Sequence, residues 1–194
     1  MNKKYIKIIT LLFIAVALII SGIFMNQIDY KKLRSEKSAM KYIAELDNIE
    51  DSSKIIIRKS ASYLQNNTNA KFYLYQYNDL LYLKVFKYKD NTYQPFGDYT
   101  TFQTNATELK YCSMETQDNK IIVVVCGYNN DSDIDHYNIV YGENMENDFS
   151  INDGYVLNIH ILKDNYPWYI ESYDQNNEYS FPIQPMFYSV NEPL

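Results

Sequence analysis

A long stretch without charged residues near the amino terminus constrains this chain more than any other feature. Residues 8–28, with the sequence IITLLFIAVALIISGIFMNQI, include no Asp, Glu, Lys, Arg or His. The segment has 21 residues, and a helix of that length reaches about 31 Å, which is enough to cross the hydrocarbon core of a bilayer. We therefore expect a single transmembrane anchor at residues 8–28, which contacts membrane lipid and follows a short tail at residues 1–7.

The residues around this segment bear on its processing and its orientation. Lys3, Lys4 and Lys7 also form the basic region of a cleaved secretory signal, but no clean A-x-A cleavage site follows. Three basic residues follow the apolar run as well, so the positive-inside count does not choose a side. Because long carboxyl-terminal domains translocate largely regardless of their charge, we expect a single-pass signal-anchor with the amino terminus inside and the domain outside.

Charge is distributed unevenly along the chain. Residues 1–41 contain eight basic and two acidic residues and carry a net charge of +6, whereas the whole chain carries −6. Residues 42–194 therefore carry −12. A domain of this charge repels phosphate backbones, and the sequence has no basic patch interleaved with aromatic residues. These features exclude nucleic acid as a partner.

The next segment, residues 29–50, is expected to form a juxtamembrane helix. Leu33, Met40, Ile43 and Leu46 fall near one side of it at helical spacing, with charged residues elsewhere. This narrow apolar stripe leaves three roles open: a stalk, a helix packed on the domain, or a helix lying on the lipid surface, where lysines gain from anionic head groups.

The stretch DSSKIIIRKSASYLQNN, which begins at Asp51, is ambiguous between a second helix and an exposed strand. Asp51 or Ser52 could cap a helix. Ile56, Ser60 and Tyr63 would share one face of that helix, and this periodicity favours the helix over the strand.

From residue 71 onward, short apolar and aromatic runs alternate with Asn/Asp pairs, a pattern typical of antiparallel hairpins. We expect residues 51–194 to form one compact, mainly antiparallel β domain of about eight or nine strands. With one or two helices on its amino-terminal side and the preceding transmembrane helix, the chain falls in the mainly β (α+β) class.

A hairpin with a two-residue turn at Asn78-Asp79 is expected in KFYLYQYNDLLYLKVF. That turn pairs Phe72 with Val85 and Leu74 with Leu83, so one face is aliphatic and favours the core. The opposite face carries Tyr73, Tyr75, Tyr77 and Tyr82. Those tyrosines are either covered by the amino-terminal helices, the favoured alternative, or form an open aromatic platform for a glycan or a partner chain.

A second hairpin is expected around Asp164-Asn165. This turn sets His160 against Tyr169 and Asn158 against Glu171 on a polar face. We therefore expect His160, Tyr169 and Glu171 on a hydrated aromatic and polar surface. A histidine in that position could sense pH or bind a metal, but a solvated strand residue is the favoured interpretation.

Cys112 and Cys126 are the two cysteines of the chain, in neighbouring strand-like runs. A two-residue turn at Asp118-Asn119 would point their sulfur atoms to opposite faces. A three-residue turn would set them directly opposite each other, within disulfide range. The run IIVVVC is apolar at every position, so alternation does not choose the register. A disulfide and two free, buried thiols both remain open.

Evidence for a metal site or for catalysis is weak. Asp131, Asp133 and Asp135 alternate as in a calcium loop, but His136 replaces the required glycine and Gly142 replaces the bidentate glutamate. A loose cation site on the three aspartates is the weak alternative to a solvated acidic loop. The chain has no G-x-S-x-G, H-E-x-x-H or C-x-x-C motif and no phosphate loop. We expect no cofactor, and the sequence favours a protein that is not an enzyme.

By elimination, the sequence predicts a membrane-anchored extracytoplasmic module that binds an envelope component or a partner protein. One alternative is an assembly component of a larger membrane complex, held by the anchor and the stripe of residues 33–46. The other is a hydrolase of envelope polymers, which would need two carboxylates about 5–10 Å apart across a cleft.

Overall fold

The computed structural model shows a mainly β protein of twelve described strands, where eight or nine were expected. Most of the strands pair antiparallel within two sheets. The structure describes residues 12–18, 31–65, 68–98, 102–103, 106–116, 118–130, 133–141, 144–152, 154–162 and 168–186.

The first sheet has five strands, with the order β1-β2-β3-β4 and β5 paired with β3. The α-helix α2 (Glu36–Leu46) and a 3₁₀ turn (Ser52–Lys54) come directly before it in the chain. Its strands are β1 (Ile56–Gln65), β2 (Thr68–Tyr77), β3 (Leu80–Lys89), β4 (Thr92–Asp98) and β5 (Phe102–Gln103).

The second sheet has seven strands in the order β10-β7-β6-β12-β11-β8-β9. The pairing of β12 with β6 is parallel and covers two residue pairs, while the others are antiparallel. The strands are β6 (Glu108–Glu115), β7 (Ile121–Asn129), β8 (His136–Tyr141), β9 (Asn144–Ser150), β10 (Gly154–Leu162), β11 (Trp168–Tyr173) and β12 (Tyr179–Pro185).

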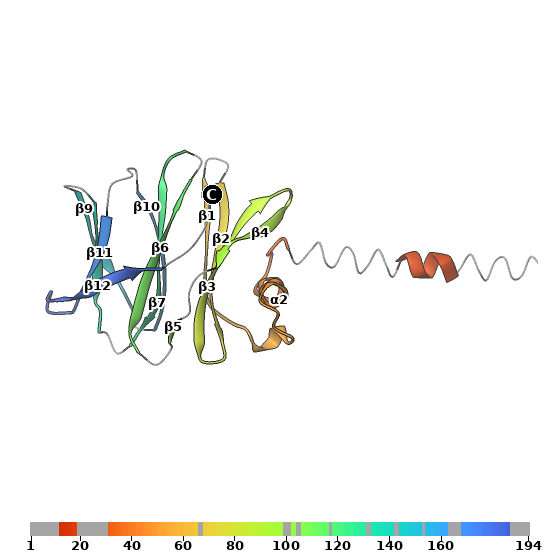
Figure 1. The fold of residues 1–194 in the computed structure, drawn as a ribbon, viewed down its shortest axis with the longest axis horizontal. Coiled ribbons are helices and arrows are strands. Elements are labelled where there is room, and N and C mark those ends of the chain that lie inside the picture. Colours follow the sequence, from red (N-terminus) through yellow and green to blue (C-terminus); the bar gives the residue numbers. More distant parts are fainter. Residues whose placement is uncertain are drawn as a thin grey trace, which may run out of the picture.

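The seven-stranded sheet turns back on itself, so the molecule is layered (Figure 1). Strands β10, β7 and β6 form a central layer between the five-stranded sheet and an outer layer of β12, β11, β8 and β9, and α2 covers the far side of the five-stranded sheet. One hydrophobic core lies between the five-stranded sheet and the central layer, and a second lies between the central and outer layers. Strand β7 contributes to both cores, which explains why IIVVVC is apolar at every position.

Helix α2 packs on the five-stranded sheet, which decides among the three roles left open for this segment. Ser35 and Ser38 form a capping box at its start. Leu33 and Ile43 are fully buried in a third core beneath α2, and Met40 and Leu46 pack against it. The apolar stripe is therefore buried by the protein's own sheet.

An ion pair secures the carboxyl-terminal end of α2 on the sheet. Asp47 caps the helix and accepts a hydrogen bond from Lys84 Nζ at 2.5 Å. Its other carboxylate oxygen accepts a hydrogen bond from the Tyr75 hydroxyl. The Lys84 side chain is only 7% exposed, so the carboxylate compensates for the cost of burying the ammonium group.

The predicted β2–β3 register is confirmed. Phe72 pairs with Val85 and Tyr75 with Tyr82, around a turn at Asn78. Asn78 has a φ of 53°, a backbone conformation that Asn adopts more readily than most residues.

The preference for a second helix was wrong. Residues after the short 3₁₀ turn at Ser52–Lys54 form β1, whose partner is β2. The β-branched run Ile55 to Ile57 favours a strand, and pairing along the edge of the sheet overrides the helical periodicity.

The predicted hairpin around residues 164 and 165 was also wrong. Strand β10 pairs with β7, and β11 pairs with β8 and β12. His160 therefore lies opposite Val123, and Tyr169 lies opposite Val140. These pairings are non-local, so a turn signal between consecutive strands could not indicate them.

The predicted transmembrane segment, residues 8–28, lies largely outside the described residues. Only residues 12–18 are described there, and they are helical. Within the part of the chain that the structure describes, no helix combines the length and the apolar character that a membrane crossing requires.

Candidate functional site

A strip of aromatic and polar side chains lies on the outward face of the outer layer. Alternate residues of β11 point outward, because Ile170 and Ser172 between them are buried. Partners on β8 and β12 extend the same face, since Tyr173 pairs with both His136 and Tyr179. We call this set the outer strip; it comprises His136, Tyr169, Glu171, Tyr173 and Tyr179.

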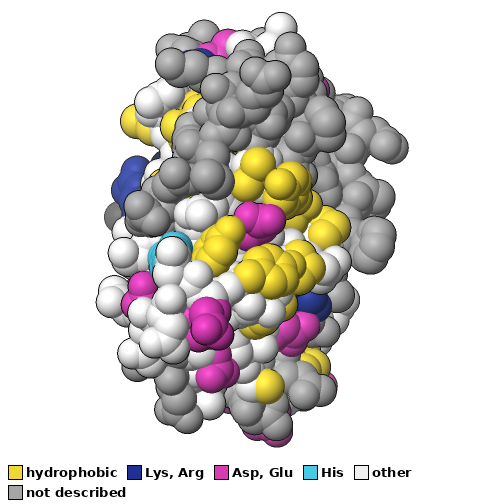
Figure 2. Space-filling view, turned by 90° about the vertical axis from the view of Figure 1, so that its left-hand side faces the viewer, with side chains coloured by type: hydrophobic (Ala, Val, Ile, Leu, Met, Phe, Trp, Pro, Cys, Tyr) yellow, Lys and Arg dark blue, Asp and Glu magenta, His cyan; other side chains and the backbone are white. Residues whose placement is uncertain are grey.

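Ring contacts join the members of the outer strip. His136 stacks on Tyr173 with centroids 5.1 Å apart and planes 7° apart, and Tyr179 meets Tyr173 edge-on at 6.2 Å. The Tyr173 hydroxyl donates to Glu171 Oε2 at 2.7 Å, and this hydrogen bond raises the pKa of Tyr173. Tyr169 and Tyr179 are 52% and 55% exposed. Figure 2 shows hydrophobic side chains beside acidic ones and histidine on this face.

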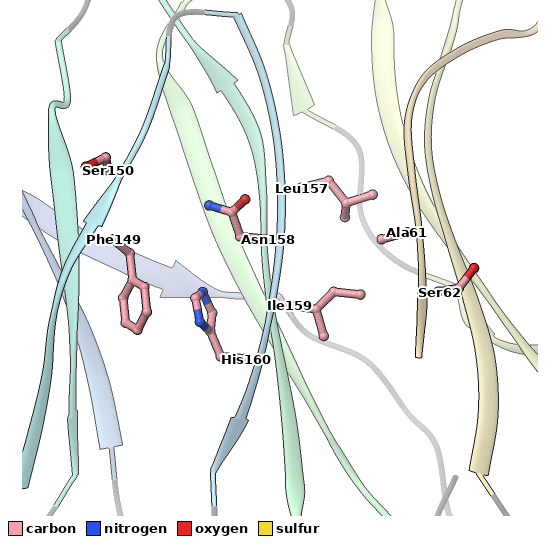
Figure 3. A pocket seen from close by; sticks show the side chains of 8 residues that line it. All are labelled: Ala61, Ser62, Phe149, Ser150, Leu157, Asn158, Ile159 and His160. Carbon is pink, nitrogen blue, oxygen red and sulfur yellow. The ribbon is translucent and has the colours of Figure 1, made fainter. Parts of the chain in front are cut away.

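A second feature is an open hollow of about 540 Å³ where three strand edges meet. Strand β10 forms its floor, β1 lies on one side and β9 on the other (Figure 3). Leu157 and Ile159 point toward Ala61 of β1, whereas Asn158 and His160 point toward Phe149 of β9. Its described lining is Ala61, Ser62, Phe149, Ser150, Leu157, Asn158, Ile159 and His160, none of which is acidic.

His160 belongs to a small polar network at the wall of this hollow. The Tyr137 hydroxyl bonds to His160 Nε2 and accepts from Asn158 Nδ2 at 3.0 Å. The His160 ring also lies 4.1 Å from the Phe149 ring, centroid to centroid. Burial lowers the pKa of His160 to about 4 and raises the pKa of Tyr137 well above its usual value.

These shifts fix the charge of the network. At neutral pH the imidazole is neutral and the Tyr137 hydroxyl keeps its proton. In a neutral imidazole one ring nitrogen donates and the other accepts, and the hydrogen bond between Nε2 and the Tyr137 hydroxyl forms with either tautomer. The hollow therefore presents an uncharged hydrogen-bonding imidazole.

The predicted surface residues divide among three places. Tyr169 and Glu171 lie on the outer strip, and His160 lies half-buried at the hollow rather than beside them. Tyr73 and Tyr75 are not surface residues, because α2 covers them and leaves 5% and 3% of them exposed. Tyr77 and Tyr82 pack against the same core.

Sequence reasoning missed His136, Tyr173 and Tyr179 on the outer strip, and Tyr137 and Phe149 beside the hollow. The alternation in WYIESY could have indicated Tyr173, because Tyr169, Glu171 and Tyr173 are two residues apart. No comparable sequence pattern indicates the partners of His160, because Tyr137 and Phe149 come from strands that do not pair with β10.

Both cysteines are free and buried in the core between the sheets. Strand β6 pairs with β7 so that Cys112 lies opposite Val124 and Cys126 opposite Lys110. Both predicted registers were therefore wrong: the loop runs from Thr116 to Lys120 and is closed by their backbone hydrogen bond. The thiols share one face but occupy diagonal positions, and burial raises the pKa of each.

The two candidate metal ligands that the structure describes have different side-chain partners. Asp133 accepts a hydrogen bond from Thr107, and Asp135 contacts His136 Nδ1 at 3.1 Å. Asp131 lies outside the described residues. No group of three metal-ligating side chains occurs among the residues whose positions are described.

Comparison with known proteins identified no relative of this chain. No family model matches the chain, and neither a curated protein nor a solved structure is significantly similar to it. The functional argument therefore depends on the geometry of the outer strip and the hollow.

Proposed function

We propose that this chain is a membrane-anchored, extracytoplasmic binding module that uses the outer strip to hold a component of the cell envelope. The observation that carries the proposal is the exposure of Tyr169 and Tyr179 on a sheet face that no described element covers. Tyrosine rings supply a large apolar contact area with a polar tip, and Glu171 and His136 add hydrogen-bonding groups beside them. This combination suits a sugar polymer or a polypeptide chain.

The proposed anchor is the apolar segment of residues 8–28. The part of it that is described, residues 12–18, is helical. Its side chains at Leu12, Phe13 and Leu18 are 66%, 77% and 67% exposed, so they are not part of the domain core. Exposing apolar side chains to water is unfavourable, and transferring them into lipid lowers the free energy, which supports a place for this segment in a bilayer.

The geometry offers less support for the two alternatives. An assembly role for the stripe of residues 33–46 requires that stripe to be accessible. Leu33 and Ile43 are instead buried in the core between α2 and the five-stranded sheet. A hydrolase would need two carboxylates across a cleft, and the described lining of the hollow contains none.

The binding proposal is tested with the full chain in lipid nanodiscs and the insoluble envelope fraction of its cells. Exchanging both Tyr169 and Tyr179 for Ser is expected to weaken co-sedimentation at least about tenfold, which corresponds to about 1.4 kcal/mol of lost contact energy. The matched control is Tyr88→Ser, because Tyr88 is 40% exposed on β3, in the other sheet. Equal binding by both variants, or no binding by the unaltered chain, contradicts the proposal.

Treatment of the envelope fraction with protease then separates the ligand classes. Binding that survives the treatment indicates a polymer, and binding that is lost indicates a protein. The orientation is tested on intact cells, where added protease should digest the domain without lysis. A domain that is degraded only after lysis contradicts the extracytoplasmic location.

A further inference from the structure

The central layer ends in a strand edge that lies in a recess. This layer has three strands, β10, β7 and β6, between a sheet of five strands and an outer layer of four. Among the described strands, β10 pairs with β7 alone. The hollow of about 540 Å³ lies along its other edge, between β1 and β9 (Figure 3). We propose that the free edge of β10 binds an extended peptide segment of a partner protein as an added strand.

The main chain of β10 supplies the first element of recognition. The strand runs for nine residues, Gly154–Leu162, in unbroken register with β7. In a strand, alternate residues direct their N–H and C=O groups to opposite edges, so every second residue of β10 points these groups away from β7. Such a row of backbone groups is a template for another strand.

The two walls of the hollow supply the second element. A strand added beside β10 would point its side chains alternately toward β1 and toward β9. Toward β1, Leu157 and Ile159 of β10 face Ala61, with Ser62 beside it. Toward β9, Asn158 and the neutral His160 face Phe149. The bound segment should therefore alternate aliphatic residues with polar residues that hydrogen-bond to Asn158 or His160.

The recess also determines which occupant fits. The described lining carries no Asp, Glu, Lys or Arg, so it offers no electrostatic attraction for a phosphate or a metal ion. Strands β1 and β9 stand on both sides of β10, so an occupant must reach the edge of β10 between them. A single extended segment needs only the width of one strand, and the volume lies within the range typical of ligand pockets.

The test uses a display library of eight-residue peptides, selected against the full chain in nanodiscs. The best peptide is then synthesised with N-methyl groups on every second residue, in two sets. A peptide that adds a strand donates only alternate N–H groups to β10. We therefore expect one N-methylated set to lose at least about tenfold in affinity and the other to change by less than about threefold. Similar losses in both sets, or a library without any binder, overturn the proposal.

A pair of protein variants locates the peptide. Ala61 lines the hollow and points toward β10, whereas Ser180 lies exposed on β12 in the outer layer. Ala61→Trp should obstruct the recess and weaken binding at least about tenfold, whereas Ser180→Trp should bind like the unaltered chain. Amide hydrogen exchange should slow in residues 157–160 when peptide is added. Unchanged exchange there, or peptide binding that both variants retain, contradicts a site at β10.

Two further outcomes distinguish peptide binding at β10 from self-association and from binding at the outer strip. Protection of residues 157–160 that rises with protein concentration in the absence of peptide would identify a second copy as the occupant and overturn the proposal. The double variant at Tyr169 and Tyr179 should bind the selected peptide normally, since the outer strip lies on a different face. Failure of the outer strip to bind envelope material therefore leaves the β10 result intact, and the reverse also holds.

Discussion

Two faces of this molecule carry tyrosines at alternate strand positions, yet one is covered and the other is open. On the five-stranded sheet, Tyr73 and Tyr75 lie beneath α2 and are almost inaccessible. On the outer layer, Tyr169 and Tyr179 are more than half exposed. The local pattern is the same in both cases. The fate of a tyrosine-bearing face therefore depends on whether another element of the chain can pack on it.

The two faces also satisfy their polar groups differently. Beneath α2, the Tyr75 hydroxyl and Lys84 share the Asp47 carboxylate, and burial raises the pKa of Tyr73 to about 12. On the outer strip, Tyr173 donates to Glu171 from within its own strand. The covered face is thus bound to its helix through a buried ion pair, whereas the open face needs no other layer to satisfy Tyr173.

The largest contrast is expected from the same substitution on each face. Tyr73→Ala should lower the free energy of unfolding by about 3–5 kcal/mol, because it leaves a cavity beneath α2. Tyr179→Ala should change the free energy of unfolding by less than about 0.5 kcal/mol, because its ring is 55% exposed. Urea denaturation of the two variants measures both values. Equal losses would mean that the two faces do not differ in burial.

The ion pair that holds α2 gives the next largest effect. Asp47→Ala should cost about 2–3 kcal/mol, somewhat less than a fully buried pair, because the Asp47 side chain retains 23% exposure. The control is Glu45→Ala in the same helix, whose ion pair with Lys31 at 3.7 Å is exposed and should contribute less than about 1 kcal/mol. A cost below about 1 kcal/mol for Asp47→Ala would show that apolar packing alone holds the helix.

A pH effect is expected from His160, which lies on the central layer and contacts Tyr137 and Phe149 of the outer layer. The pKa of His160 is about 4 in the folded protein and 6.5 in the unfolded chain. Below pH 6.5 the unfolded chain therefore binds a proton that the folded protein does not, so stability falls as the pH drops from 6.5 to 4. The loss attributable to this group should be about 2 kcal/mol, after allowance for its partial exposure.

The measurement compares the unaltered chain with His160→Gln, which keeps an uncharged hydrogen-bonding group beside the Tyr137 hydroxyl. Denaturation at several pH values between 7 and 4 gives the free energy of unfolding of both proteins. Their difference isolates the effect of His160, because the carboxylates titrate alike in both. A difference that does not change with pH would contradict the burial of His160.

The smallest contrast removes one hydroxyl from each face. Tyr75→Phe deletes a hydrogen bond to the partly buried Asp47 and should cost about 1.5 kcal/mol. Tyr173→Phe deletes the bond to Glu171 at the surface, where water replaces it, and should cost less than about 0.5 kcal/mol. Thermal unfolding followed by circular dichroism resolves the two, and a larger cost for Tyr173→Phe would reverse the comparison.

The sequence predicted local pairing where a turn and an alternating pattern agreed. The Asn78-Asp79 turn and the aliphatic side from Phe72 to Val85 predicted the β2–β3 register, which the structure confirms. The β6–β7 register failed because β7 is buried on both faces and has no alternation to read. Its loop is also longer than either predicted turn.

The candidate sites also divide into residues that a local pattern indicates and residues that only non-local pairing brings together. Tyr169 and Glu171 were predicted on a polar face through a hairpin with β10 that does not form, and the alternation within β11 is what places them on the outer strip. Their neighbours His136 and Tyr179 join them through pairings between β8, β11 and β12, which no local signal specified. The recess along β10 depends on three strands that do not pair with one another, so it was not predictable.

By itself, the sequence determined the mainly β class and one hairpin register. These depend on composition and on a period of two, which are local properties of the chain. Only the tertiary structure decided that α2 would cover one tyrosine face, that the other would stay open, and that β10 would end the central layer. Those outcomes depend on which apolar surfaces meet when distant segments pack, because burial is a property of the whole fold.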